Sequence, residues 1–83
     1  MFLPGYLVAP GEVLNDYLEA GKMSQADLAK QTGLPHKTIS DIVEGTAPLT
    51  MDVAVKLQYV LGRPAHFWLN LEALYQEDKA RLS

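Results

Sequence analysis

The sequence predicts an all-α domain of five helices that contains a helix-turn-helix. Apolar residues recur three and four positions apart in five short segments, which is the spacing of one helix face. Glycines and prolines separate these segments, and no run shows the alternation that is typical of a strand. The 83 residues, 48% of them hydrophobic, suffice for one small core. We therefore expect a single domain over residues 1–83.

The N-terminal part is expected to be an arm followed by a helix. Pro4 and Gly5 interrupt residues 1–9, which we predict to be an extended arm. The first helix is predicted from Gly11 to Ala20, and the following glycine ends it. Its apolar stripe consists of Val13, Leu14, Tyr17 and Leu18.

Residues 24–45 carry the signals of two helices joined by a tight turn, in the spacing of a helix-turn-helix. Ser24 can cap the first helix, with Asp27 as the reciprocal partner of a capping box. Gly33 can supply the left-handed residue that ends this helix, and Pro35 suits the first turn of the next. The residues expected to face the core are Leu28, Ala29, Ile39 and Ile42.

The outward face of the second of these helices, which Gly45 closes, is polar. It carries His36, Lys37, Thr38, Ser40 and Asp41. Short polar side chains near a helix N-terminus fit the major groove of DNA. We therefore expect this face to bind DNA. The alternative is an ordinary αα-hairpin, which needs the same cap, turn and buried aliphatic residues without contacting DNA.

Two more helices are predicted after a turn at residues 46–50. Thr50 can cap the fourth helix, which stops at Gly62, and its buried residues are predicted to be Val53, Leu57, Val60 and Leu61. Pro64 opens the fifth helix, residues 64–81, which carries more apolar surface than one core needs. We expect one edge of this surplus to pack against a second copy of the chain. The residues expected at that seam are Trp68, Leu71, Leu74 and Tyr75. The alternative is a core stripe with one additional leucine.

Charge and cysteine content narrow the functional classes. The formal net charge is −3, whereas DNA-binding proteins usually have a basic face. The acidic residues Glu12, Asp16 and Glu19 lie in the first 21 residues, where no basic residue accompanies them, so the acidity lies mostly outside the candidate DNA-reading face. The absence of cysteine excludes disulfides and thiolate metal sites and fits a reducing cytoplasm.

Membrane, cofactor and catalytic roles are not expected. No apolar run reaches membrane-spanning length, and the N-terminus lacks the basic region of a signal peptide. His36 and His66 lie on different predicted helices, without HExxH or paired-carboxylate spacing. We therefore expect no catalytic residue, no metal and no cofactor, and a cytoplasmic location.

Several motifs together resemble the HigA antitoxins of the Xre (Cro/repressor-like) helix-turn-helix class. They are residues 9–14 (APGEVL), 24–29 (SQADLA), 37–40 (KTIS), 42–45 (IVEG) and 66–71 (HFWLNL). The resemblance implies five helices, with a homodimer seam formed largely by the last. It also implies autorepression through a palindromic operator in double-stranded DNA. The implied protein partner is a HigB-like, ribosome-dependent endoribonuclease toxin that the antitoxin neutralises.

The resemblance also implies roles for individual residues. Gln25 matches the position that holds a DNA phosphate, and His36, Lys37 and Asp41 match base-reading positions. Thr38 and Ser40 flank them, and Thr46 completes the DNA-binding set. The toxin is expected on a surface away from these residues, for which we select Glu12, Asp16 and Glu19.

The sequence departs from the family pattern at three positions. Position 9 is Ala where His is more usual, Pro35 stands where a serine commonly caps, and Asp41 replaces an amide or a basic residue. Two alternatives therefore stay open. One is the N-terminal DNA-binding head of a longer Xre regulator, and the other is a protein-interaction module without DNA binding.

Overall fold

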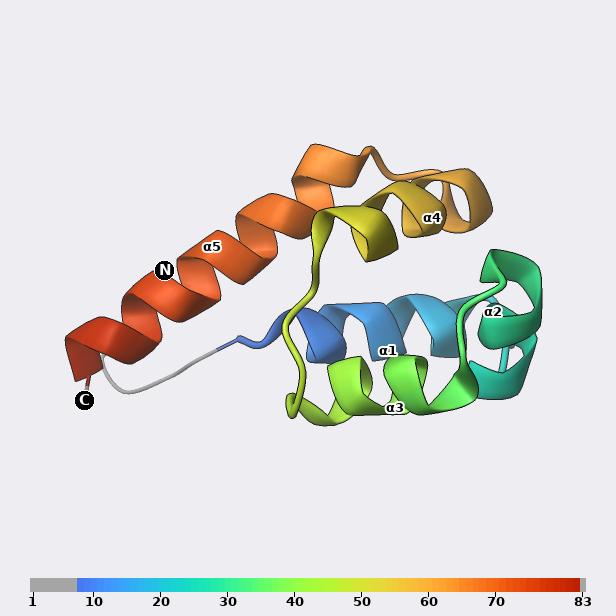
Figure 1. Ribbon diagram of the computed structural model, residues 1–83, viewed down its shortest axis with the longest axis horizontal. Helices are drawn as coiled ribbons and strands as arrows, with labels where there is room; N and C mark the ends of the chain where they lie inside the picture. The colour runs from blue at the N-terminus through green and yellow to red at the C-terminus, as the bar shows by residue number, and fades with distance from the viewer. Residues whose placement is uncertain (1–7, 83) are drawn as a thin grey trace.

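The computed structural model describes residues 8–82 and confirms an all-α architecture of five helices (Figure 1). The helices are α1 (Pro10–Ala20), α2 (Gln25–Thr32), α3 (His36–Glu44), α4 (Met51–Leu61) and α5 (Ala65–Leu82). Residues 1–7 of the predicted arm lie outside the described part of the chain. Ala9, the last residue of that arm, is extended, with φ −75° and ψ 145°.

The core lies among all five helices. Its buried side chains are Leu14, Leu18, Leu28, Ala29, Ile39, Ile42, Leu49, Val53, Ala54, Leu57 and Trp68. In Figure 1, α3 lies on the side of the body opposite α4, with α1 between them, and the second half of α5 extends away from the body. The face of α3 that could read DNA is thus remote from α4.

Several predicted helix boundaries are wrong by one residue, each for a backbone reason. The first helix begins at Pro10, where a missing N–H costs nothing because no intrahelical acceptor exists there. Pro35 occupies the N-cap position of α3 in an extended conformation, with ψ 144°, so the helix begins at His36. The fifth helix begins after Pro64, at Ala65. The predicted caps Ser24 and Thr50 are confirmed.

Of the four residues predicted to be buried in the fourth helix, two are buried. Val53 and Leu57 are buried in α4, whereas Val60 and Leu61 are only half-buried at its C-terminal end. The helix ends at Gly62, which has a φ of +84°, and the chain then turns into α5. The last turn of α4 therefore covers the core only in part.

Gly11 sets the distance between α1 and α3. It is buried at the start of α1, and a Cβ added there would lie 2.1 Å from the carbonyl oxygen of Ile42 and 2.6 Å from that of Val43. Only glycine lets the first turn of α1 approach the last turn of α3 so closely. This contact explains the glycine in the motif at residues 9–14, for which the sequence alone gives no structural reason.

We predict that Gly11→Ala destabilises the fold by about 1–3 kcal/mol, because an overpacked contact forces α1 and α3 apart. Gly21→Ala is the matched control. A Cβ at Gly21 meets its nearest atom at 3.4 Å, and its φ of −87° suits alanine. Thermal or urea unfolding of both variants is the measurement. Equal stabilities for the two variants would contradict the proposed close contact.

Candidate nucleic-acid interface

Local hydrogen bonds fix the start and end of α2. Ser24 Oγ accepts a bond from the Asp27 backbone N–H at 3.0 Å, and Asp27 Oδ2 accepts one from the Ser24 backbone N–H at 3.1 Å. This pair is the predicted capping box. Gly33, with φ +76°, ends the helix in the left-handed conformation, as the sequence predicts. Both ends of α2 are thus determined by residues within four positions.

The tertiary contacts of α3 decide which of its faces meets solvent. Ile39 and Ile42 are buried on one side, where α1 and α2 pack. Leu28 and the small Ala29 of α2 are buried against the same core. Because a helix cannot bury one stripe without exposing the opposite one, the polar side chains of α3 are turned outward.

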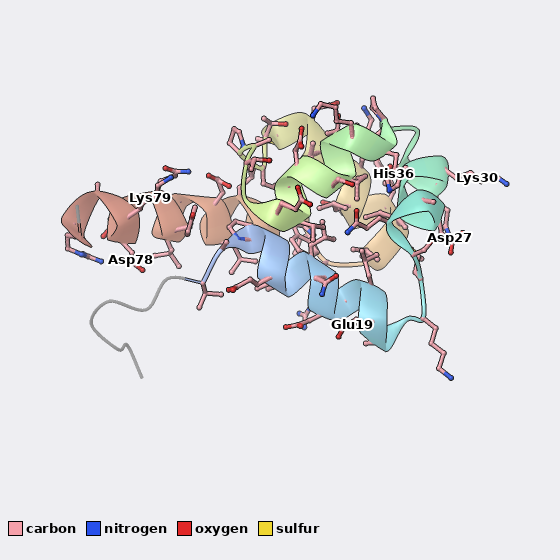
Figure 2. All side chains as sticks on the ribbon, turned by 90° about the horizontal axis from the view of Figure 1, so that it is seen from below. Glu19, Asp27, Lys30, His36, Asp78 and Lys79 are labelled. Atoms are coloured by element: carbon pink, nitrogen blue, oxygen red, sulfur yellow. The ribbon has the colours of Figure 1, made fainter. Side chains whose placement is uncertain are left out.

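The outward face of α3 brings the predicted DNA-binding residues together. His36 and Lys37 are exposed in its first turn, and Thr38, Ser40 and Asp41 are half-buried. Thr46 is exposed just beyond the helix, and its hydroxyl donates to the Asp41 carbonyl at 3.2 Å. Figure 2 shows His36 at the start of this helix, close to the end of α2 that carries Lys30. The sequence-predicted set therefore forms one surface.

An ion pair reduces the positive charge of this surface. Lys37 Nζ lies 3.3 Å from Asp41 Oδ2, one turn further along α3. The Lys37 side chain is 85% exposed and the Asp41 side chain 29% exposed. Such an exposed pair contributes little to folding. It holds the lysine along the helix, directly beside the acidic residue that departs from the family pattern.

Gln25 and Ser40 link the two helices of the motif. Ser40 Oγ donates to Gln25 Oε1 at 2.8 Å, and both residues are half-buried. The sequence alone predicts them as separate DNA contacts. No spacing rule predicts this bond, because the partners lie 15 positions apart on different helices.

Asp27 is an electrostatic feature of the same motif. The hydrogen bond from the Ser24 backbone N–H lowers the pKa of the Asp27 carboxyl below its usual range. The Ser24 side chain and the positive charge of nearby Lys30 lower this pKa further. The carboxylate also lies in the first turn of α2, where the helix dipole favours negative charge. The capping box is therefore strongest when Asp27 is ionised.

The predicted toxin-binding residues form an exposed stripe on α1. Glu12, Asp16 and Glu19 are spaced by four and three positions, which places them on one helix face. Asn15 donates to Glu19 Oε1 at 3.1 Å. In Figure 2, Glu19 lies at an edge of the molecule turned away from His36. The stripe is thus separate from the polar face of α3.

The predicted dimer residues do not share one environment. Trp68 is wholly buried within the chain. Its ring packs edge-on against the rings of Tyr17 and Phe67, with centroid distances of 5.5 and 5.0 Å. The prediction for Trp68 is therefore wrong, since it has no surface to offer a second copy. Leu74 is 56% exposed, and Leu71 and Tyr75 are half-buried. Leu74 is therefore the only one of these four predicted residues that is mostly exposed.

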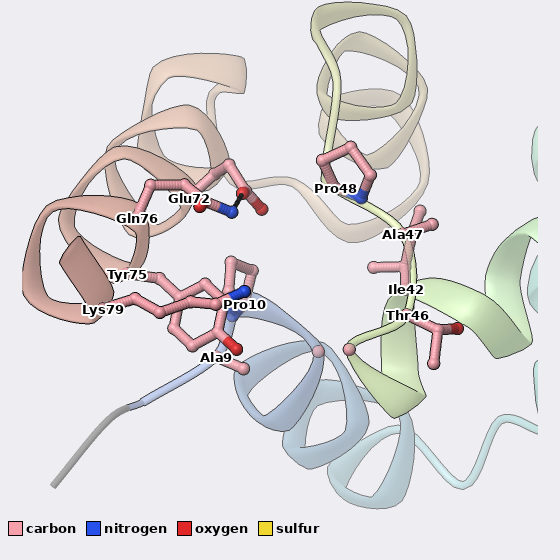
Figure 3. A pocket seen from close by; sticks show the side chains of 12 residues that line it. Ala9, Pro10, Ile42, Thr46, Ala47, Pro48, Glu72, Tyr75, Gln76 and Lys79 are labelled. Carbon is pink, nitrogen blue, oxygen red and sulfur yellow. Dashed lines mark hydrogen bonds between the residues drawn. The ribbon is translucent and has the colours of Figure 1, made fainter. Parts of the chain in front are cut away.

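A cleft of about 210 Å³ lies between the start of α1, the loop after α3 and the second half of α5 (Figure 3). Tyr75 and Lys79 line it from α5, and Pro10 lines it from α1. Glu72 sets the position of α5 at this point, because its Oε1 accepts from the Leu49 backbone N–H at 3.0 Å. The sequence carried no signal for this bond, which joins residues 23 positions apart.

Two further kinds of feature are absent from the described residues. Among residues 8–82, no helix is both long enough and apolar enough to cross a membrane. In the same part of the chain, no three acidic, histidine or cysteine residues cluster as metal ligands would.

Comparison with known proteins identifies the family of this chain. The family model described as "Helix-turn-helix" (HTH_3) matches residues 14–68. The chain belongs to the helix-turn-helix family. The matched region spans α2 and α3 and reaches the first turn of α5. Besides α2 and α3 it contains most of α1 and all of α4, so the helix pair is one part of the matched region.

Three similar proteins carry informative names. Antitoxin HigA-1 from Vibrio cholerae is 36% identical over 66 residues, which cover 78% of this chain and 62% of that protein. The structure of Pseudomonas aeruginosa antitoxin HigA with the higBA promoter matches with a TM-score of 0.87 and 30% identity, over 90% of this chain and 83% of that one. An addiction-module antidote protein of the HigA family from Coxiella burnetii matches with a TM-score of 0.83 and 32% identity, over 95% and 84% of the two chains.

The matched region is shorter than the curated relatives. It spans 59–67% of the length of three of them, including a Haemophilus influenzae transcriptional regulator that is 36% identical. The two solved HigA structures are covered to more than four fifths. The domain described here is therefore the part that these proteins have in common.

We predict that Asp27→Asn lowers the melting temperature at neutral pH and that this difference disappears in acid. A carboxyl whose pKa is lowered by folding stabilises the native state at pH values above its unfolded pKa of about 3.9. That stabilisation is lost as the pH falls through the folded pKa. Asp16→Asn, at an exposed position of α1, controls for the loss of one negative charge. A difference that persists unchanged at pH 2 would contradict the role of the ionised cap.

Proposed function

We propose that this chain is a HigA-type antitoxin that represses its own promoter as a dimer and neutralises a HigB-like endoribonuclease toxin. The observation that carries the proposal is the polar, outward face of α3, which packs on α2 inside the region that the helix-turn-helix family model matches. The likeness to an antitoxin solved with its promoter adds support, at a TM-score of 0.87 over nine tenths of the chain.

For DNA binding, α3 enters the major groove with its first turn facing the bases. Lys37 and Thr38 read base edges, with His36 and Ser40 beside them, and Gln25 holds a phosphate. Asp41 can accept a hydrogen bond from the exocyclic amine of cytosine while it keeps its ion pair with Lys37. Thr46, just beyond the C-terminal end of α3, then lies next to the DNA backbone.

The electrostatic contribution to DNA binding is expected to be small. The net charge is −3, and the lysine of the reading face is paired with Asp41. Hydrogen bonds from side chains and helix N-termini would then supply most of the backbone contacts. The affinity should fall with salt by a log–log slope of about −0.9 for each phosphate neutralised, with few such phosphates.

The second half of α5 supports a two-fold dimer. Leu74 is 56% exposed and Tyr75 is half-buried in the second half of α5, and Leu71 lies one turn earlier, packed in part against the core. Burying one such side chain contributes about 1.5–3 kcal/mol. A dimer built there would present two copies of α3 to half-sites about 34 Å apart, one turn of the duplex.

The acidic stripe on α1 suits a basic toxin. Glu12, Asp16 and Glu19 are exposed and lie away from the face of α3. A small basic endoribonuclease could therefore bind while the reading face holds DNA. Opposite charge across such a contact speeds association more than it tightens the complex.

The DNA-binding proposal is tested by titrating the protein with the duplex upstream of its own gene. We expect Lys37→Ala to weaken operator binding by about 1–3 kcal/mol and to relax the preference at one base position. Lys56→Ala is the control, because it removes the same charge on α4, across the molecule from α3. Replacing one half-site should reduce binding nearly to that of random duplex.

The result that would overturn the DNA-binding proposal is equal affinity for the upstream site and random duplex at low salt. The function would then be that of a protein-interaction module. A preference for the upstream site that Lys37→Ala leaves intact would instead remove only this residue from the set of base contacts.

The toxin proposal is tested by co-expression with the product of the neighbouring gene. We expect a stable complex and rescue of growth. Asp16→Lys should slow association several-fold at low salt, with little effect on dissociation. Glu77→Lys, on the exposed end of α5, is the matched charge reversal. A complex whose association responds equally to both reversals would exclude the α1 stripe as its contact surface.

A further inference from the structure

The hydrogen bond between Ser40 and Gln25 indicates that Ser40 has a role on the polar face other than contact with DNA bases. Gln25 is the first residue of α2, and Ser40 is the fifth of α3. The serine hydroxyl donates to Gln25 Oε1 at 2.8 Å, and both side chains are half-buried. The hydroxyl of Ser40 is therefore already engaged with α2 before any DNA is present.

The direction of this bond matters for phosphate recognition. The oxygens of a DNA phosphate only accept hydrogen bonds, so a glutamine can hold one only through its Nε2 hydrogens. The amide of glutamine has one accepting and one donating end, and it is otherwise free to rotate. A donor bound to Oε1 selects the orientation in which Nε2 remains available for another acceptor.

The position of Gln25 adds a second reason for phosphate binding. It lies at the first position of α2, directly after the capping residue Ser24. Backbone N–H groups in a first helical turn lack intrahelical acceptors, and the helix dipole favours an anion there. Ser24 Oγ already accepts from the Asp27 N–H, which leaves the N–H groups of Gln25 and Ala26 at this end of α2. A correctly oriented Gln25 amide would donate to the same anion as these groups.

We propose that Ser40 is a positioning residue that orients the Gln25 amide toward a DNA phosphate, and that it does not read bases. The inference rests on the proposed DNA binding and deepens it, because it divides the polar face by role. His36, Lys37 and Thr38 remain available for base edges. Ser40 and Gln25 together hold a phosphate of the DNA backbone, and we call this pair the clamp.

The benefit of the clamp is preorganisation. A free glutamine side chain loses rotamer freedom when it binds, whereas one already held by Ser40 loses less. Fixing one flexible side chain in advance is worth about two- to tenfold in affinity. This gain is independent of the DNA sequence, because a phosphate carries no base identity.

The test measures the binding of five proteins to operator and scrambled duplexes: wild type, Ser40→Ala, Ser40→Thr, Gln25→Ala and the Ser40→Ala/Gln25→Ala double variant. We expect Ser40→Ala to weaken both duplexes equally, by about two- to tenfold, so that the specificity ratio is unchanged. Ser40→Thr keeps a hydroxyl and should restore binding. The double variant should bind no more weakly than Gln25→Ala alone, since the serine acts only through the glutamine.

Two controls separate the clamp from general effects. Gln31→Ala removes an exposed glutamine from the same helix and should leave both affinities unchanged. Gln25→Glu keeps an acceptor for Ser40 but has no hydrogen to donate to phosphate, so it should bind as weakly as Gln25→Ala or more weakly. Melting temperatures of all variants show whether the fold is kept.

Three results would overturn the inference while leaving DNA binding intact. The first is a lower specificity ratio in Ser40→Ala, which would make Ser40 a residue that reads bases. The second is that Ser40→Ala changes the affinity for neither duplex. The third is that the losses of the two single variants add up in the double variant. Failure of the proposed function would look different, because the wild-type protein itself would then show no preference for the operator.

Discussion

The packing of α3 against α1 and α2 is the constraint on which the rest of the structure depends. Ile39 and Ile42 anchor one side of this helix in the core. At its C-terminal end the carbonyls of Ile42 and Val43 lie so close to α1 that only Gly11 fits between them. A short helix held at both points cannot rotate, so the direction in which its polar residues face is fixed by burial on its other side.

The polar face that results is organised but nearly neutral. Lys37 is paired with Asp41, and Ser40 with Gln25, so two of the outward-facing residues are held by neighbours. A separate acidic stripe lies on α1, away from this face. A surface of this kind supplies directional hydrogen bonds more than a general attraction to the phosphate backbone, which favours geometry over net charge in recognition.

The fifth helix divides its apolar residues between two tasks. Its first half contributes Trp68 to the core, in edge-on contact with Tyr17 and Phe67. Its second half leaves the body and exposes Leu74. Glu72 lies at the transition and accepts a hydrogen bond from the Leu49 backbone N–H, which ties this turn of α5 to the loop before α4. One continuous helix therefore serves both the fold and an outward surface.

The sequence by itself determined the features that depend on neighbours within about four positions. The cap at Ser24, the left-handed Gly33 and the burial of Ile39 and Ile42 all follow from local backbone chemistry and helix periodicity. Only the tertiary structure decided that Trp68 is internal, that Gly11 is a contact point and that Ser40 binds Gln25. These features join residues far apart in the chain, and their pairing depends on how helices pack, which periodicity does not encode.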